Sequence, residues 1–421
     1  METLDSGPLA PEDVARLRMG VPENPMVITA ALLLERPIGR EDLIRLLEAR
    51  LLRHRRFRQR VVESSGWSAP RWVDVPAFDL SEHCAFRAVR GEEPSLESSV
   101  SECMSARLDP ERPLWRVDVT DGGAAGPVLI FCVHHVLADG EALVTILGGL
   151  TDEGAHTQAE PAPPTAMSSA GRARSLLGGV VGGVVGAARF ALRSTDPKAL
   201  HLRLGTTKLV AFSRAMPLSD LASRAHASGV TVTEMLLAAV AGALGERLAA
   251  ADGRREGAVH ALVPVSVRAG VSAAAGNRFT SVLVPLPIAV LDPSQRLRLA
   301  ADGLRAARSR TIVGAGVRLV GAAGLVGGAI ERLGVSLFSH KASVVVSSVR
   351  GPGEPLHLGG SLLRDIIVWA PPPGAIALAV TLMSYAGGVR VGVSADARAI
   401  GDPGPIARAI ERDLGVPRNR A

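Results

Sequence analysis

Residues 127–143 read PVLIFCVHHVLADGEAL, which places two adjacent histidines at the end of an apolar run. Val, Ile, Leu and Phe dominate positions 127–136, and the turn-forming pair Asp139-Gly140 follows, so the sequence predicts a buried strand that ends in a tight loop. Neighbouring side chains on a strand point to opposite faces. We therefore expect His134 and His135 to have different roles, with at most one of them facing a given cavity.

Length and composition indicate a globular protein. The chain has 421 residues, enough for about two domains, and 47% of them are hydrophobic while 21% are charged. The cysteines Cys84, Cys103 and Cys132 lie far apart and form no CxxC pair. This pattern favours a reducing compartment and argues against a structural zinc site.

The net charge of +6 depends on arginine. Six arginines fall within residues 49–62, ARLLRHRRFRQRVV, namely Arg50, Arg53, Arg55, Arg56, Arg58 and Arg60. The cluster is typical of a solvated helix end, and it also fits a lipid headgroup layer or the phosphates of a nucleotide-bearing substrate. Because only 3% of residues are aromatic and no recognition motif accompanies the charge, nucleic acid is not an expected partner.

Two apolar segments resemble membrane helices but are short. They are LLGGVVGGVVGAA at 176–188 and LVGAAGLVGGAI at 319–330, whereas a bilayer span needs about 17 to 25 residues. Each fits either a buried or interdomain helix or an interfacial membrane contact. No secretory signal is expected, because residues 1–14, METLDSGPLAPEDV, are acidic and lack an apolar centre.

The pattern of elements predicts an α/β fold. Helices are expected to dominate the first hundred residues, including one within 39–60, and a helix is expected near Glu141. Seven strand-like segments fill the second half, interrupted by a helix that begins with a Thr231-x-x-Glu234 capping box. We divide the chain into an N-terminal half at 1–150, a Pro/Gly-rich linker with a Gly-rich helix at 151–204, and a C-terminal half at 205–421.

Several chemistries for the histidine pair can be compared. Adjacent strand histidines diverge and no His/Cys cluster completes a ligand set, so a metal site is not expected. The sequence has neither a GxSxG nucleophile elbow nor a GxxxxGK[ST] phosphate loop. Two interpretations stay open: a hydrogen-bonded structural pair, or general-base catalysis by one neutral imidazole.

The stretch HHVLADG fits the HHxxxDG motif of the coenzyme A-dependent acyltransferase superfamily, and the whole chain resembles its bacterial wax ester synthase/diacylglycerol acyltransferase branch. The segments LAPEDVARL, NPMVITAALL, RFRQRVV and RPLWRVDV are similar to that family's N-terminal half, in order. SVRAGVSAAAGNRFTSVLVPLPI, VVSSVRGPGEPLHLGG and VTLMSYAGGVRVGVSAD resemble its C-terminal signatures. Together they cover nearly the whole chain except the linker.

The resemblance implies a role for each matching residue. His135 would be the general base, His134 would support it from the opposite face, and Asp139 would hold the loop through a polar contact. Gly140 would permit the tight turn. Asn277 would donate a hydrogen bond to the developing oxyanion, although a turn asparagine fits the position as well.

Two further residues have weaker assignments. Trp115, in the PLW element, and Ser384, in SYAGG, are candidate substrate contacts, and both also fit packing or hairpin roles. The chain departs from the family at Thr233-Glu234, where Asn-Asp is usual, at Ser348 and Arg350 in the NVPGP region, and at Val27 in place of a His. These departures bear on substrate choice and activity.

The implied protein is a two-domain enzyme of the chloramphenicol acetyltransferase-like fold, with His135 near the middle of a tunnel between its halves. It would move a long acyl group from acyl-CoA, a substrate, to diacylglycerol or a fatty alcohol, with no cofactor or metal. It would be cytoplasmic, bound peripherally to the inner face of the membrane or to lipid inclusions. The alternatives are a non-catalytic lipid-binding or lipid-droplet protein of the same fold, and transfer to an amine or a polyketide hydroxyl.

Overall fold

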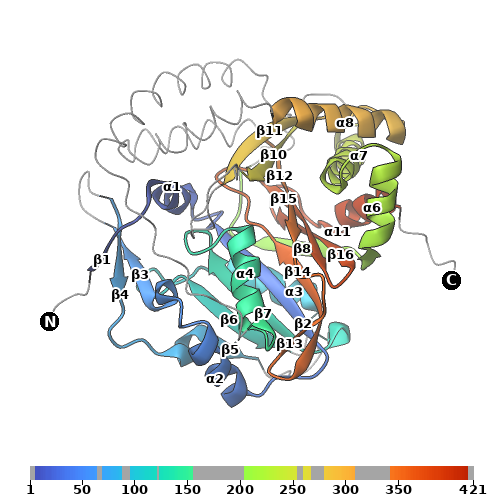
Figure 1. Ribbon diagram of the computed structural model, residues 1–421. Coiled ribbons are helices and arrows are strands. Elements are labelled where there is room, and N and C mark those ends of the chain that lie inside the picture. Colours follow the sequence, from blue (N-terminus) through green and yellow to red (C-terminus); the bar gives the residue numbers. More distant parts are fainter. Residues whose placement is uncertain are drawn as a thin grey trace.

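The computed structural model describes residues 5–63, 69–87, 95–120, 123–154, 203–253, 259–266, 279–308 and 342–415. Within these ranges two large sheets with helices packed on their faces form the body of the molecule, and a small third sheet lies near the N-terminus (Figure 1). The predicted α/β class is confirmed. The small sheet has the order β1 (Asp5–Pro8), β4 (Arg71–Asp74), β3 (Gln59–Val62).

The first large sheet holds the histidine strand at its centre. Its order is β13 (Leu356–Leu358), β14 (Ser361–Trp369), β2 (Val27–Leu34), β7 (Val128–His134), β6 (Trp115–Thr120) and β5 (Cys84–Phe86). Every residue of β2 and β7 is buried, because helices cover both faces of this sheet. The helices α2 (Arg40–Arg50) and α4 (Gly140–Leu150) pack on one face, and α3 (Leu96–Ser105) packs on the other.

Two strands of the first sheet come from the C-terminal part of the chain. β14 pairs antiparallel with β2, so that Ile367 lies opposite Ala31, and β13 extends the sheet beyond β14. The predicted boundary at 205 therefore does not separate two structural units cleanly. The crossing strands belong to the second half in sequence and to the first sheet in space.

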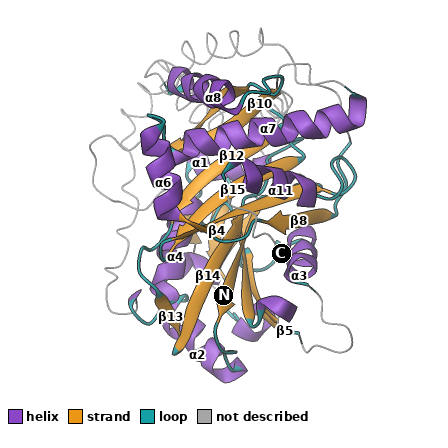
Figure 2. Ribbon diagram, turned by 90° about the vertical axis from the view of Figure 1, so that its right-hand side faces the viewer, coloured by secondary structure: helices purple, strands orange, loops and turns teal. Residues whose placement is uncertain are grey.

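The second large sheet is built from the rest of the C-terminal half. Its order is β11 (Phe279–Leu286), β10 (Val259–Ser266), β12 (Val344–Arg350), β15 (Leu378–Tyr385), β16 (Gly388–Asp396) and β8 (Lys208–Phe212), and β9 (Met216–Pro217) also pairs with β16. The helices on this half are α6 (Leu218–Ala227), α7 (Val232–Asp252), α8 (Pro293–Ala307) and α11 (Gly404–Asp413). Figure 2 shows α7 lying across this sheet with α8 close to it.

The predicted elements of the second half are confirmed. All seven strand-like segments contain strands, and α7 begins at the predicted capping box, in which Thr231 and Glu234 each accept a hydrogen bond from the other's backbone N–H. The strand predicted within 127–136 is confirmed as β7, but it ends at His134, so that His135 lies in the turn and not on the strand. The helix near Glu141 is confirmed as α4. The expectation that helices dominate the first hundred residues is wrong, because this region also contributes β1 to β5.

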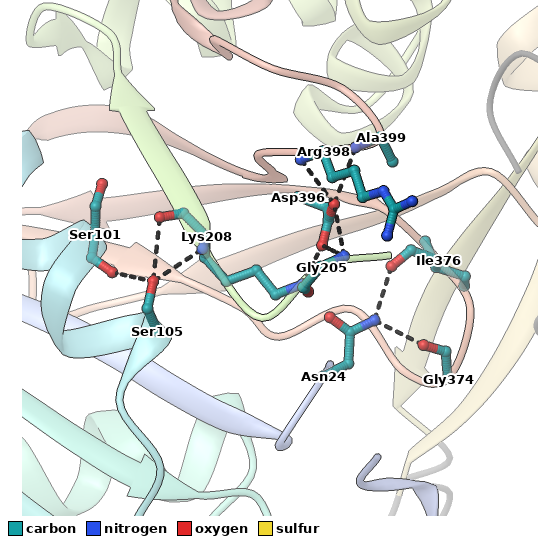
Figure 3. A network of polar contacts seen from close by, with 10 residues as sticks. All are labelled: Asn24, Ser101, Ser105, Gly205, Lys208, Gly374, Ile376, Asp396, Arg398 and Ala399. Carbon is teal, nitrogen blue, oxygen red and sulfur yellow. Dashed lines mark hydrogen bonds and ion pairs between the residues drawn. The ribbon is translucent and has the colours of Figure 1, made fainter. Parts of the chain in front are cut away.

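A buried polar network joins the two halves (Figure 3). The backbone N–H of Lys208 on β8 donates to Ser105 Oγ on α3 at 2.8 Å, and Asn24 Nδ2 donates to the carbonyls of Gly374 and Ile376 at 2.7 and 2.9 Å. The Lys208 ammonium pairs with the Asp396 carboxylate at 2.7 Å, and both side chains are almost fully buried. The hydrogen bonds of Ser105 and Asn24 cross between the halves and help to fix the position of one half against the other.

Candidate active site

The two histidines lie where β7 ends and a turn begins. His134 is the last residue of the strand, opposite Val27 on β2, and His135 is the first residue of the turn. The backbone N–H of His134 donates to the Leu114 carbonyl at 2.9 Å, and that of His135 donates to the Met26 carbonyl at 2.8 Å. Backbone bonds to segments on both sides therefore hold the pair in place.

The residue that accepts the His135 N–H has an unusual backbone. Met26 has a φ of 56°, in the left-handed region that few residues other than glycine adopt. Strained backbone positions persist where the surrounding structure fixes them, and they gather at functional sites. The sequence gives no signal for this feature, because methionine is not a residue type expected there.

The two imidazoles have different environments. His134 is buried, and its Nδ1 accepts a hydrogen bond from the backbone N–H of Val136 at 3.1 Å. His135 is half-buried as a residue, yet its Nδ1 is inaccessible to solvent. Burial lowers the pKa of His134 to about 4 and the pKa of His135 to about 3, so both rings are neutral at physiological pH.

Helix α1 (Pro11–Met19) brings a buried cation to the site. The Arg16 guanidinium is only 7% exposed and pairs with Asp13 at 3.2 Å. After burial, the positive charge of Arg16 is the next cause of the lowered pKa of His135. Gly20, just beyond this helix, lies so that a Cβ there would be 3.8 Å from His134 Nε2. The sequence gave no reason to select Arg16.

Asp139 acts at the start of α4. It is the N-cap residue, and its Oδ1 accepts a hydrogen bond from the backbone N–H of Ala142 at 2.8 Å. Within the described part of the chain this carboxylate makes no ion pair. The polar contact expected of Asp139 is therefore a helix cap, which fixes where α4 begins relative to the histidine turn.

Gly140 does not adopt a positive φ, so its place after the turn does not use the conformational freedom of glycine. It is the first residue of α4, and a Cβ at this position would lie 3.2 Å from Val349 Cγ2 on β12. The glycine allows α4 to approach the second sheet closely. Ser348 and Arg350, the departures on β12, flank Val349 and are exposed.

The structure gives the other candidate residues, Trp115, Ser384 and Asn277, no described contact with the histidine pair. Trp115 is 1% exposed, stacks on His83 with ring centroids 4.5 Å apart and donates from Nε1 to the Phe57 carbonyl at 2.9 Å, a packing environment. Ser384 is buried, and its Oγ accepts from the backbone N–H of Gly351 at 3.3 Å. Their substrate contacts stay predictions. Asn277 lies outside the described residues, as do the apolar segments 176–188 and 319–330.

The arginine cluster is largely engaged within the protein. Arg50 pairs with Asp152 at 2.8 Å, and Arg55 with Asp74 at 2.6 Å. Arg60 pairs with Glu111 at 2.5 Å, while Arg56 lies 4.5 Å from the centre of the Trp72 ring. Arg53 and Arg58 are exposed and make no ion pair within the described ranges.

Within the described ranges, no three His, Cys, Asp or Glu side chains are grouped so as to hold a metal ion. All three cysteines are free thiols and buried. Among the described helices none is by itself long and apolar enough to cross a bilayer, and α6 and α7 pass that test only as a pair bent by 91°.

Comparison with known proteins connects this geometry to a family. The profile of the wax ester synthase/diacylglycerol acyltransferase catalytic domain matches residues 9–236, and that of the WS/DGAT C-terminal domain matches residues 275–416. A Mycobacterium tuberculosis protein named as a diacylglycerol O-acyltransferase is 30% identical, over 98% of this chain and 94% of its own length.

Solved structures agree with the sequence matches. The wax ester synthase/diacylglycerol acyltransferase from Marinobacter aquaeolei VT8 superimposes with a TM-score of 0.68 at 25% identity, covering 97% of this chain and 98% of that one. The first condensation domain of the CDA synthetase gives a TM-score of 0.60 at 16% identity, covering 98% and 97%. The second likeness shows that the fold is shared.

Proposed function

Since the chain belongs to the wax ester synthase/diacylglycerol acyltransferase family, it is an acyl-CoA-dependent acyltransferase, and we propose that it moves a long-chain acyl group to the hydroxyl of diacylglycerol or a fatty alcohol. The observation that supports this most is the catalytic-domain match over 9–236, a range that includes the neutral His135. The proposed acceptors, diacylglycerol and a fatty alcohol, are those in the names of the relatives. The proposal that His135 is the base is supported by its place at the turn after β7 and by its neutral ring.

His135 acts as the general base in a complex that holds both substrates. Its neutral imidazole takes the proton of the acceptor hydroxyl as the oxygen attacks the thioester carbonyl. A new C–O bond forms, the C–S bond breaks, and the departing coenzyme A thiolate takes the proton from the imidazolium. Burial and the Arg16 charge lower the pKa of His135 to about 3, so the ring is neutral before reaction and the imidazolium, once formed, is a strong acid towards the thiolate.

His134 and Asp139 position this base. The ring of His134 accepts the Val136 N–H and so holds the turn, while Asp139 caps α4 directly after it. The same proposal gives Asn277 the role of oxyanion donor, on the resemblance to the family, and gives Trp115 and Ser384 the role of substrate contacts. The active-site tunnel between the halves, with no cofactor or metal in it, is part of the same proposal.

The lipid substrates also imply a place of action. We propose that the protein works peripherally on the inner face of the membrane or on lipid inclusions, supported by the exposed Arg53 and Arg58. A lipid-binding protein without turnover is disfavoured by the catalytic-domain match. Transfer to an amine or a polyketide hydroxyl has no specific support beyond a shared fold.

A coenzyme A release assay tests the proposal. Purified protein is given acyl-CoA donors with diacylglycerol, a fatty alcohol, an amine or no acceptor, and the lipid product is identified by mass spectrometry. Ester formation that depends on His135 supports the proposal. Folded protein that releases no coenzyme A with any pair would instead identify the non-catalytic alternative, and amide formation would identify a different acceptor class.

A further inference from the structure

A buried asparagine anchors the segment that leads into β2. Asn24 is 1% exposed, and its Nδ2 donates to the carbonyls of Gly374 and Ile376 at 2.7 and 2.9 Å (Figure 3). The backbone N–H of Asn24 donates to the Val21 carbonyl at 2.9 Å, and the Val21 N–H donates to the Asn24 carbonyl at 3.0 Å. The side chain and the backbone of Asn24 are therefore both held by hydrogen bonds.

The acceptors of the Asn24 amide lie in a loop that has little freedom. Residues 371–373 are three prolines, whose rings fix their φ angles. The Ile376 N–H closes the loop by donating to the Pro373 carbonyl at 3.2 Å, and the chain then enters β15. Within the described residues the Asn24 Oδ1 has no hydrogen-bond partner, so the side chain acts there as a donor only.

Asn24 lies two residues before Met26, whose carbonyl holds His135. Met26 is opposite His135, one position beyond the last pair between β2 and β7, and its carbonyl accepts the His135 N–H at 2.8 Å. Its φ of 56° costs free energy for a residue with a Cβ. If nothing held this conformation, φ could relax to a negative value and the Met26 carbonyl could rotate away from the His135 N–H.

Pro25 connects the anchor to Met26. Its ring fixes its own φ, and a proline confines the residue before it to extended backbone, so few torsions are free between Asn24 and Met26. The position of the Met26 carbonyl is therefore set by the contacts of Asn24 on one side and by the pairing of β2 with β7 on the other.

We infer that Asn24 is a positioning residue: by binding the 371–376 loop it holds Met26 in the left-handed conformation and so fixes the backbone of the base, His135. The inference rests on the proposed acyl transfer. The loop connects β14 to β15. The C-terminal half of the chain thus helps to orient a base that the N-terminal half carries.

Steady-state kinetics with one acyl-CoA donor and one acceptor test this role. We expect Asn24→Ala to lower kcat by about tenfold or more and to leave the KM for the donor nearly unchanged, because the base is misplaced while the substrate contacts remain. Asn24→Asp keeps the shape of the side chain but loses its NH2 group, so it should not restore kcat.

Ser105→Ala is the matched control. Ser105 Oγ accepts the Lys208 N–H at 2.8 Å, so this residue also bonds the two halves together, but between α3 and β8 and not beside the histidine turn. Its loss should lower the melting temperature without lowering kcat. An equal fall in kcat in Asn24→Ala and Ser105→Ala would overturn the inference, because any bond between the halves would then have the same effect.

Two substitutions at Met26 separate its backbone from its side chain. Met26→Gly and Met26→Ala both remove the buried thioether, but only glycine adopts a positive φ readily. We expect the kcat of Met26→Gly to exceed that of Met26→Ala by about threefold or more. Equal values would overturn the inference. Melting temperatures establish that each variant folds, and this pair keeps the test available if Asn24→Ala does not.

Amide hydrogen exchange gives a readout that needs no turnover. The bond to Met26 should protect the His135 N–H in the wild type, and Asn24→Ala should raise its exchange rate by about tenfold or more, whereas Ser105→Ala should not. Unchanged exchange at His135 in folded Asn24→Ala overturns the inference. Wild-type protein that releases no coenzyme A would contradict the proposed function, and the exchange rates would still decide whether Asn24 positions His135.

Discussion

The backbone N–H of Val136 donates a hydrogen bond to Nδ1 of His134 at 3.1 Å. A neutral imidazole that accepts at Nδ1 carries its proton on Nε2, so this bond fixes the tautomer of His134. It also closes the turn that displays His135. One histidine of the pair is therefore part of the scaffold that orients the other.

Replacing each histidine by alanine should separate these roles. We expect His135→Ala to lower acyl transfer by at least about 10²-fold with little change in melting temperature, because the general base is lost. His134→Ala should act mainly through stability, because it removes a buried ring and leaves the Val136 N–H without its acceptor. Equal loss of activity in two well-folded variants, or a larger loss for His134→Ala, would contradict the assignment.

The lowered histidine pKa values predict how stability depends on pH. The pKa of His134 is about 4 in the folded protein, while an unfolded histidine titrates near 6.5. Between these values the unfolded chain binds more protons, so folding stability rises with pH and falls as acid is added. For His134 the slope is up to about 1.4 kcal/mol per pH unit.

Denaturant unfolding of the wild type and of His134→Gln between pH 4 and 7 measures this slope, and the variant should show a shallower one.

The pH dependence of the reaction rate should differ from that of stability. Because the pKa of His135 is about 3, kcat/KM should show no inflection near pH 6.5. A bell-shaped profile with an acid limb at 6.5 would mean that the base titrates as an ordinary histidine.

Asp139 offers a test of capping against charge. As an N-cap, it can be replaced by asparagine with little loss, since both residues accept the Ala142 N–H, whereas Asp139→Ala should cost about 1 kcal/mol. Activity should follow the same order, because α4 begins directly after the histidine turn. If thermal unfolding shows Asp139→Asn to be as unstable as Asp139→Ala, the carboxylate charge rather than the cap is what matters.

Local patterns predicted the elements around the site well. The apolar run before His134 gave β7, and the Thr231-x-x-Glu234 spacing gave the start of α7, because strand alternation and capping depend on neighbours in the chain. The order of motifs also led to the family. These features are local or sequential, and sequence reasoning recovers such features directly.

The features that the sequence did not predict depend on contacts between segments far apart in the chain. The pairing of β14 with β2 unites residues from opposite ends of the chain, and neither strand's composition names its partner. The same holds for Arg16, whose charge reaches His135 only because α1 packs on the turn, and for Gly140, whose neighbour is Val349. The ion pairs of Arg50 and its neighbours were likewise not visible in a charge count.

The buried ion pair of Lys208 and Asp396 should stabilise the second sheet, where it joins the paired strands β8 and β16. Lys208→Met leaves a buried carboxylate without its cation, so we expect a loss of about 3 to 5 kcal/mol in the free energy of unfolding. Adding Asp396→Asn removes the uncompensated charge and should recover part of that loss. A double-mutant cycle by denaturant unfolding measures the coupling.

The exposed pair of Arg45 and Asp42 is the control for this cycle. Its side chains are 71% and 60% exposed, and an exposed pair contributes about 1 kcal/mol or less. Arg45→Met should therefore be nearly neutral. If Lys208→Met proves as mild as Arg45→Met, the stability of the second sheet does not depend on this ion pair.

The exposed arginines of the cluster predict reversible binding to anionic membranes. Because Arg53 and Arg58 are exposed and make no ion pair within the described residues, we expect reversible binding to anionic vesicles that high salt weakens, since exposed charges are screened within about 8 Å at physiological ionic strength. Each basic residue near such a surface contributes about 1 kcal/mol. The Arg53→Gln/Arg58→Gln double variant should therefore partition about tenfold or more less strongly at low salt.

Vesicle flotation at low and high salt measures this binding, and the Arg398→Gln/Arg408→Gln double variant, which removes the same charge from exposed positions in the second half, should float like the wild type. Equal weakening in both variants would mean that net charge, and not the segment around Arg53, drives attraction. Wild-type protein that never floats would remove the support for peripheral binding and favour a buried place for the segments 176–188 and 319–330. Protein that only detergent releases would mean that an apolar anchor, rather than arginine, holds it at the bilayer.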